Sequence, residues 1–141
     1  MVNTFLPYSS FTLSAQTLDY RRLNKQILEA DQILSALKKE RDGFQGRIGW
    51  INHPATRMWR GYELALEFYR DIMLDEWICR GYKSTRKFIG WKDNTITITP
   101  PWVGNEAFHA AHRSNLLRKD PIYYGKFGWT EPNDLPYVWP V

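Results

Sequence analysis

Two long segments of this chain repeat apolar residues at intervals of three and four, and this spacing constrains the fold more than any other feature. In an α-helix it places the apolar side chains on one face, where they can pack against another element. It predicts a first helix from Ser14, its N-cap, to about Lys39. It predicts a second from Pro54 to Arg80, followed by Gly81 as the C-cap. The second is richer in apolar residues, so we expect it to be the most buried.

The other segments are predicted to hold one more helix and long loops. Asn105 can cap a third helix that runs to about Arg118. Residues 1–13 are interpreted as an irregular or extended arm, and residues 82–104 as a long connection. Within that connection, residues 95–99 alternate Thr and Ile like a short strand, which two prolines then stop.

A length of 141 residues is typical of one domain, and no internal repeat or linker divides the chain. Residues 121–141 combine four prolines with six aromatic side chains, so we expect irregular coil there. We therefore predict a single compact all-α domain over residues 1–141, with three helices, long loops and an aromatic C-terminal tail. The single cysteine, Cys79, excludes an internal disulfide and a thiolate zinc cluster. No apolar run approaches a membrane span, so no membrane partner is expected.

The chain combines a basic balance with many aromatic residues. It has 19 Lys and Arg against 15 Asp and Glu, and 16% of its residues are Phe, Trp or Tyr. Nucleic-acid-binding sites combine cations, which bind phosphates, with aromatic rings, which stack on bases. The alternative is that most of these aromatic residues belong to the core.

One flank of the first predicted helix carries Arg22, Gln26 and Glu29 in a row, at spacings of four and three. A carboxylate beside a cation at the edge of a groove could take part in catalysis. The alternative is a solvated helix flank, which is the usual place for such residues.

The three histidines offer caps or polar contacts rather than a metal site. His53 precedes Pro54 and can cap the second helix, whereas His109 and His112 share one face of the third. That pair is expected to line a polar site or to contact phosphate, and all three histidines, with Arg22, are candidate nucleic-acid-binding residues. A zinc site needs three or four ligands, and no closely spaced motif supplies them, so we predict no metal.

Cations and rings alternate near the end of the third helix. The residues that form this candidate nucleic-acid surface are Arg113, Arg118, Lys119, Tyr123, Tyr124 and Lys126. Such an arrangement is expected of a surface that binds phosphates and stacks on bases. The alternative is a cationic helix end that offsets the helix dipole.

Four strings of the sequence occur in the order and spacing of one known family. They are Leu18-Asp19 with Glu29 eleven residues after Leu18, Gly49-Trp50-Ile51-Asn52-His53-Pro54, Cys79-Arg80-Gly81-Tyr82, and Tyr123-Tyr124-Gly125-Lys126. Over about residues 15–127 the chain resembles the pyrimidine-dimer DNA glycosylases, also called endonuclease V of the phage and viral type.

The resemblance implies an all-α domain that acts in two steps on ultraviolet-damaged double-stranded DNA. Removal of Met1 would free the α-amine of Val2, which attacks the sugar, releases the base and forms an imine. Elimination then nicks the strand at the abasic site. By register, Glu29 orients and stabilises this chemistry, and Tyr123 and Tyr124 would pack along the damaged strand.

The resemblance also implies an enzyme that needs no cofactor, acts as a monomer on cyclobutane dimers, and is cytoplasmic, either nucleoid-associated or encoded by a phage or virus. An α-amine has a reference pKa of about 7.7–8.0, so part of it is unprotonated at neutral pH. Three alternatives stay open. They are a glycosylase for a different modified pyrimidine, a non-catalytic nucleic-acid-binding protein on the same scaffold, and a module whose aromatic tail docks a protein.

Overall fold

The computed structural model describes residues 3–90 and 99–140, and within them it confirms an all-α fold without strands. The elements are α1 (Phe11–Thr17), α2 (Tyr20–Arg41), α3 (Pro54–Trp59), α4 (Glu63–Cys79), α5 (Glu106–Lys119), α6 (Pro121–Tyr124) and a 3₁₀ turn, η1 (Gly125–Phe127). Three helices are long, as predicted, and three are short. The strand-like run at 95–99 lies outside the described residues except for Thr99. None of the helices described is long and apolar enough to cross a membrane.

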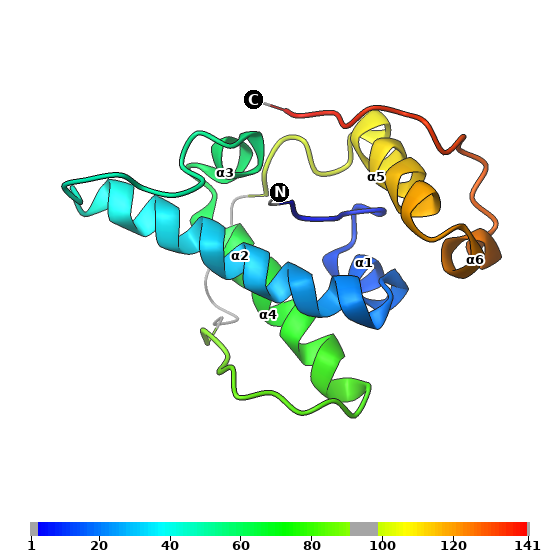
Figure 1. Cartoon of the computed structure of the whole chain (residues 1–141), viewed down its shortest axis with the longest axis horizontal. Coiled ribbons are helices and arrows are strands. Elements are labelled where there is room, and N and C mark those ends of the chain that lie inside the picture. Colours follow the sequence, from blue (N-terminus) through cyan, green and yellow to red (C-terminus); the bar gives the residue numbers. More distant parts are fainter. Residues whose placement is uncertain (1–2, 91–98, 141) are drawn as a thin grey trace.

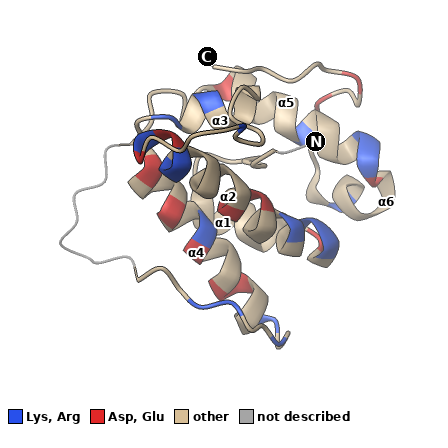
Figure 2. Cartoon of the chain, turned by 60° about the vertical axis from the view of Figure 1, so that its left-hand side comes forward, with Lys and Arg blue, Asp and Glu red and all other residues tan. Residues whose placement is uncertain are grey.

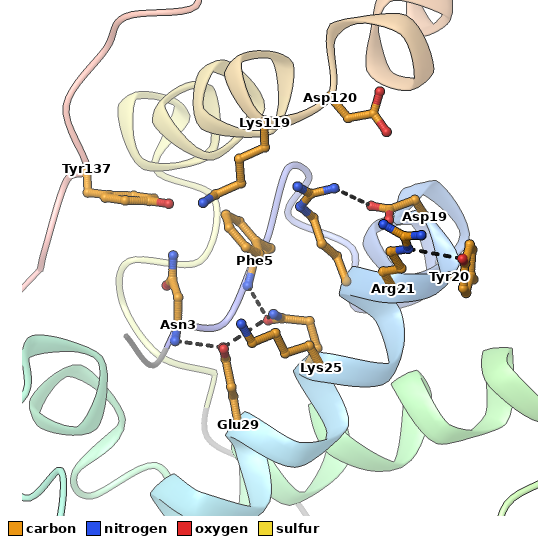
Figure 3. Close-up of a pocket in the computed structure, with 12 residues that line it drawn as sticks. Asn3, Phe5, Asp19, Tyr20, Arg21, Lys25, Glu29, Lys119, Asp120 and Tyr137 are labelled. Atoms are coloured by element: carbon orange, nitrogen blue, oxygen red, sulfur yellow. Dashed lines mark hydrogen bonds and ion pairs between the residues drawn. The ribbon is translucent and has the colours of Figure 1, made fainter.

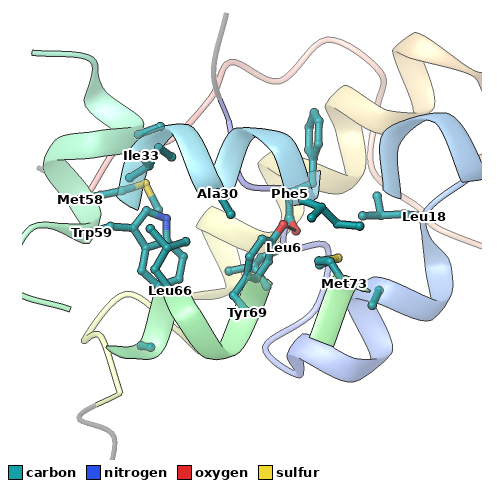
Figure 4. Close-up of a cluster of buried hydrophobic side chains, with 14 of the residues drawn as sticks. Phe5, Leu6, Leu18, Ala30, Ile33, Met58, Trp59, Leu66, Tyr69 and Met73 are labelled. Atoms are coloured by element: carbon teal, nitrogen blue, oxygen red, sulfur yellow. Dashed lines mark hydrogen bonds between the residues drawn. The ribbon is translucent and has the colours of Figure 1, made fainter. Parts of the chain in front are cut away.

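The core forms where α2 packs across α4 (Figures 1 and 4). Ala30 and Ile33 of α2 meet Leu66, Tyr69 and Met73 of α4, and all five side chains are fully buried. These are the stripes of three-four spacing in the sequence, now facing each other.

The first predicted helix is two helices. Ser10, not Ser14, is the first N-cap, because its Oγ accepts a hydrogen bond from the Leu13 N–H. The backbone at Leu18 is extended and ends α1, and α2 begins at Tyr20. The Arg80 guanidinium donates to the Leu18 carbonyl oxygen at 2.7 Å and to two further carbonyls of α1. A cation from the end of α4 thus satisfies the carbonyls that the break leaves open.

The second predicted helix is also divided, between α3 and α4. The break contains Gly61, whose φ of +88° favours glycine over any residue with a side chain. His53 caps α3 as expected, since its Nδ1 accepts from the Ala55 N–H at 3.0 Å. The apolar spacing runs through the break, which is why spacing alone does not reveal it.

In the C-terminal region, residues 121–127 are helical instead of the predicted irregular coil, whereas residues 128–140 are irregular as predicted. Asn105 caps α5 as expected, since its Oδ1 accepts from the Phe108 N–H at 3.3 Å. After α6 and η1 the chain runs back along α5 (Figure 1). The Leu135 N–H donates to the Ser114 hydroxyl at 3.0 Å, and the Asn115 amide donates to the Leu135 carbonyl at 3.2 Å. These bonds hold the returning segment against the helix.

Residues 3–7 of the N-terminal arm lie between α2 and α5 and are buried (Figure 1). The Phe5 N–H donates to Gln26 Oε1 on α2 at 2.7 Å. On the α5 side, the Leu6 N–H donates to His112 Nδ1 and the Leu6 carbonyl accepts from His109 Nδ1, both at 2.8 Å. The two histidines are 2% and 1% exposed, so they anchor the arm, and their burial argues against the predicted phosphate contact.

Burial makes His112 a source of acid sensitivity. Burial is the main cause that lowers its pKa to about 3, and Nε2 has no hydrogen-bond partner among the described residues. Because the unfolded chain binds this proton at about pH 6.5, the stability gained from a neutral His112 is complete above that pH. It is lost towards pH 3, at roughly 1.4 kcal/mol per pH unit.

We therefore expect His112→Asn, which keeps an acceptor near the Leu6 N–H but cannot titrate, to flatten the acid side of the stability curve. Urea unfolding at half-unit steps from pH 7 to pH 4 measures this slope. An unchanged slope would show that other groups cause the acid loss.

Candidate active site

A pocket of about 600 Å³ opens where the arm, α2, α5 and the C-terminal segment meet (Figure 3). Its walls come from both ends of the sequence. The lining residues are Asn3, Phe5, Asp19, Tyr20, Arg21, Arg22, Lys25, Gln26, Glu29, Lys119, Asp120 and Tyr137. The row of Arg22, Gln26 and Glu29 predicted on one helix flank thus lies in a single pocket.

Glu29 lies at the floor of this pocket and is only 5% exposed, which rules out the solvated flank. The arm covers that flank, and the Asn3 N–H donates to Glu29 Oε2 at 2.8 Å. Burial raises the pKa of the Glu29 carboxyl, and the Asn3 N–H opposes that rise. A carboxylate whose pKa is raised by burial is a stronger base than an exposed one, and it can stabilise a cation beside it.

Cations surround the carboxylate. Arg22 and Lys25 of α2 and Lys119 at the end of α5 line the pocket, and Figure 2 shows Lys and Arg gathered at these two helix ends. Arg22 Nη1 lies 3.1 Å from Asp19 Oδ1, which fixes its position. Burial, followed by the charge of Arg22, lowers the pKa of the Lys119 ammonium. The rim is therefore suited to phosphates around a buried acid.

The other predicted cations lie outside the pocket. Arg113 is held by Glu106 and Glu131 and donates to the Pro7 carbonyl at 2.7 Å, so these partners compete with any phosphate. Arg118 is exposed near the end of α5 and donates to Asn115.

The two adjacent tyrosines have different environments. Tyr124 is fully buried and its hydroxyl donates to the Asp19 carboxylate, so it joins α6 to the start of α2 and does not lie on a surface. Tyr123 is half-buried, with the Lys126 ammonium 4.0 Å from its ring centroid. The structure thus leaves Tyr123 and Lys126, but not Tyr124, on the surface near the basic rim.

Sequence reasoning missed several lining residues. Lys25 is four residues before Glu29, and that spacing could have placed it beside the carboxylate. No sequence pattern predicts that Asn3 and Tyr137 line the pocket, because they reach it only through the paths that the arm and the tail take in the folded chain. Val2 lies outside the described residues, and Asn3 is the first residue described.

No three His, Cys, Asp or Glu side chains come close enough to hold a metal ion within residues 3–90 and 99–140. The groups that the pocket does bring together are a buried carboxylate, several cations and the backbone of the arm.

A family model described as pyrimidine dimer DNA glycosylase matches residues 2–90, more than half of the chain. The match includes the arm, all of α2 and Glu29. The chain belongs to this family. Membership confirms the resemblance that the sequence strings indicated and identifies a DNA glycosylase, an enzyme that binds DNA. No curated protein and no solved structure matches the chain. Two residues that line the pocket of this glycosylase, Lys119 and Tyr137, lie beyond the part of the chain that the family model matches.

Proposed function

We propose that this glycosylase excises cyclobutane pyrimidine dimers from double-stranded DNA through its α-amine, nicks the resulting abasic site, and acts as a monomer. The observation that carries the proposal is the 2.8 Å hydrogen bond from the Asn3 N–H to the buried Glu29 carboxylate. Covalent geometry keeps the nitrogen of residue 2 within about 3.6 Å of the Asn3 nitrogen. If Met1 is removed, this limit keeps the free α-amine of Val2 close to the Glu29 carboxylate.

The chemistry needs a nucleophile and a nearby carboxylate. The unprotonated amine forms a bond to C1′ of the damaged nucleotide while the bond from C1′ to the base breaks. The electron pair of that bond stays on the base, which in a dimer remains joined to the neighbouring pyrimidine. The nitrogen then loses a proton, and the C1′–O4′ bond breaks with protonation of O4′, which gives a protonated imine. Glu29 can take the proton, since burial raises its pKa, and when ionised it stabilises the cationic imine. Loss of a C2′ proton from the imine then breaks the C3′–O bond, and this elimination cuts the strand with the 3′ phosphate as the leaving group.

The basic rim supports binding to the DNA backbone. Arg22, Lys25 and Lys119 surround the pocket mouth, so the phosphates flanking a damaged nucleotide would meet cations on both sides. Binding through such contacts weakens steeply as the salt concentration rises.

Borohydride trapping tests the proposal. Borohydride reduces an imine to a stable amine, so protein mixed with ultraviolet-irradiated duplex should form a covalent adduct at the Val2 peptide, located by mass spectrometry. Duplex with a preformed abasic site should give the same adduct. An adduct on abasic DNA alone would keep the imine chemistry and point to a different modified pyrimidine. No adduct from protein with a confirmed free amine would contradict the enzyme mechanism and favour the binding protein.

A further inference from the structure

Three hydrogen-bond donors from three separate segments meet on one side of the pocket, away from the helix that carries Glu29. Asn3 comes from the arm, Lys119 from the end of α5 and Tyr137 from the C-terminal segment. In Figure 3 the Tyr137 hydroxyl and the Lys119 ammonium point toward each other, and the Asn3 side chain extends toward both. We call these three residues the donor wall.

The Asn3 amide is fixed as a donor toward the pocket. Its Oδ1 accepts a hydrogen bond from the Thr4 N–H at 2.7 Å, which settles which end of the amide carries the NH₂ group. The residue is only 3% exposed, and its Nδ2 makes no hydrogen bond of good geometry within the described part of the chain; a loose hydrogen bond with the Tyr137 hydroxyl lowers the pKa of that phenol. A buried donor whose hydrogen bond is poorly made is costly, so a ligand oxygen in the pocket would be a better acceptor for it.

Tyr137 is held in place by packing, although it belongs to a segment without regular structure. Its ring meets the ring of His112 edge-on at 6.0 Å, and it also contacts Phe5. Two residues before it, Leu135 is bonded to α5. Burial is the main cause that raises the pKa of the Tyr137 phenol, so the hydroxyl keeps its proton at neutral pH and can donate.

We propose that the donor wall binds a carbonyl oxygen of the pyrimidine base that leaves, so that Tyr137, with Asn3 and Lys119, determines base specificity. This inference rests on the proposed function. A pyrimidine presents carbonyl oxygens at its edge, and when the bond to C1′ breaks, the electron pair of that bond stays on the base. The negative charge reaches the carbonyl oxygen, where the three donors meet it. Phe5 lines the same pocket and offers a ring for the face of the base.

A base-binding role and a phosphate-binding role predict different results, because an abasic site has phosphates but no base. Tyr137→Phe should slow cleavage of the glycosidic bond in irradiated duplex by at least about tenfold. Strand cleavage of a duplex with a preformed abasic site should stay within about twofold of wild type. Tyr20→Phe and Arg21→Gln are the matched controls, because both residues line the opposite end of the pocket. Neither should change the ratio of the two rates.

Equal losses on both substrates, or no loss of glycosidic-bond cleavage, would overturn the proposal. A wild-type protein that cleaves neither substrate would instead contradict the proposed function.

A binding measurement tests the donor wall without catalysis. In protein carrying Glu29→Gln, adding Tyr137→Phe should weaken binding to dimer-containing duplex but not to duplex with a stable abasic analogue. Equal affinities of both proteins for dimer-containing duplex would again overturn it, and circular dichroism checks that each variant is folded.

Discussion

Glu29→Gln is expected to abolish cleavage of the glycosidic bond and strand nicking, by at least about a thousandfold, while damaged DNA still binds. Glutamine can neither take the proton released during imine formation nor stabilise the cationic imine. It retains an oxygen that can accept the Asn3 N–H, so the arm should stay in place. Nicking of irradiated plasmid measures activity, and a gel-shift titration measures binding.

Glu67→Gln is the matched control for this variant. Burial raises the pKa of Glu67 as it does for Glu29, but Glu67 lies on α4 and does not line the pocket. It should retain wild-type activity. Equal loss of nicking in both variants would show that loss of a partly buried carboxylate disturbs the fold, and would remove the evidence for a chemical role of Glu29.

The stability of Glu29→Gln separates a chemical from a structural role. The pKa of Glu29 is raised in the folded protein, so burial of this group favours the folded state when protonated. That contribution is complete below about pH 4.5 and is lost as the pH rises through the folded pKa. At pH 8 the variant should therefore melt at or above the wild-type temperature. A clear fall in melting temperature there would mean that the ionised carboxylate holds the arm.

The second large effect is expected when the α-amine is moved. One glycine inserted before Val2 shifts the amine by about 3.5 Å along the chain. The distance over which a nucleophile can reach C1′ is smaller than this shift, so cleavage of the glycosidic bond should fall by at least about a hundredfold. A glycine added after Val141 is the control and should have no effect. Both are measured by nicking of irradiated duplex.

Full activity of the N-terminally extended protein would contradict an α-amine nucleophile. The lysines of the pocket, Lys25 and Lys119, would then be the next candidates, and the peptide trapped by borohydride would distinguish them.

The helices could be predicted where local sequence determines them. Apolar spacing located the two packed helices, and the Asn105 cap located α5. The breaks at Leu18 and Gly61 could not be predicted, because the apolar stripe continues through them. The first is stabilised by Arg80, a residue from another helix.

In the candidate site, too, local features could be predicted and those that depend on tertiary structure could not. The row that contains Glu29 follows from helix geometry, whereas its burial depends on an arm whose path no local pattern records. His109 and His112 look like surface ligands on an isolated helix. They are buried because the backbone of Leu6 lies across them and the tail covers them. Asn3 and Tyr137 reach the pocket only through tertiary structure.

The bonds to Leu6 have a consequence for the order in which the enzyme becomes active. Its carbonyl and N–H are held by side chains 103 and 106 positions further along the chain. During synthesis the ribosome makes the arm first, but the residues that hold it emerge only after most of the protein has been translated. The arm is therefore the first part made and among the last parts fixed in place. A nascent chain should have no activity toward DNA until α5 has left the ribosome.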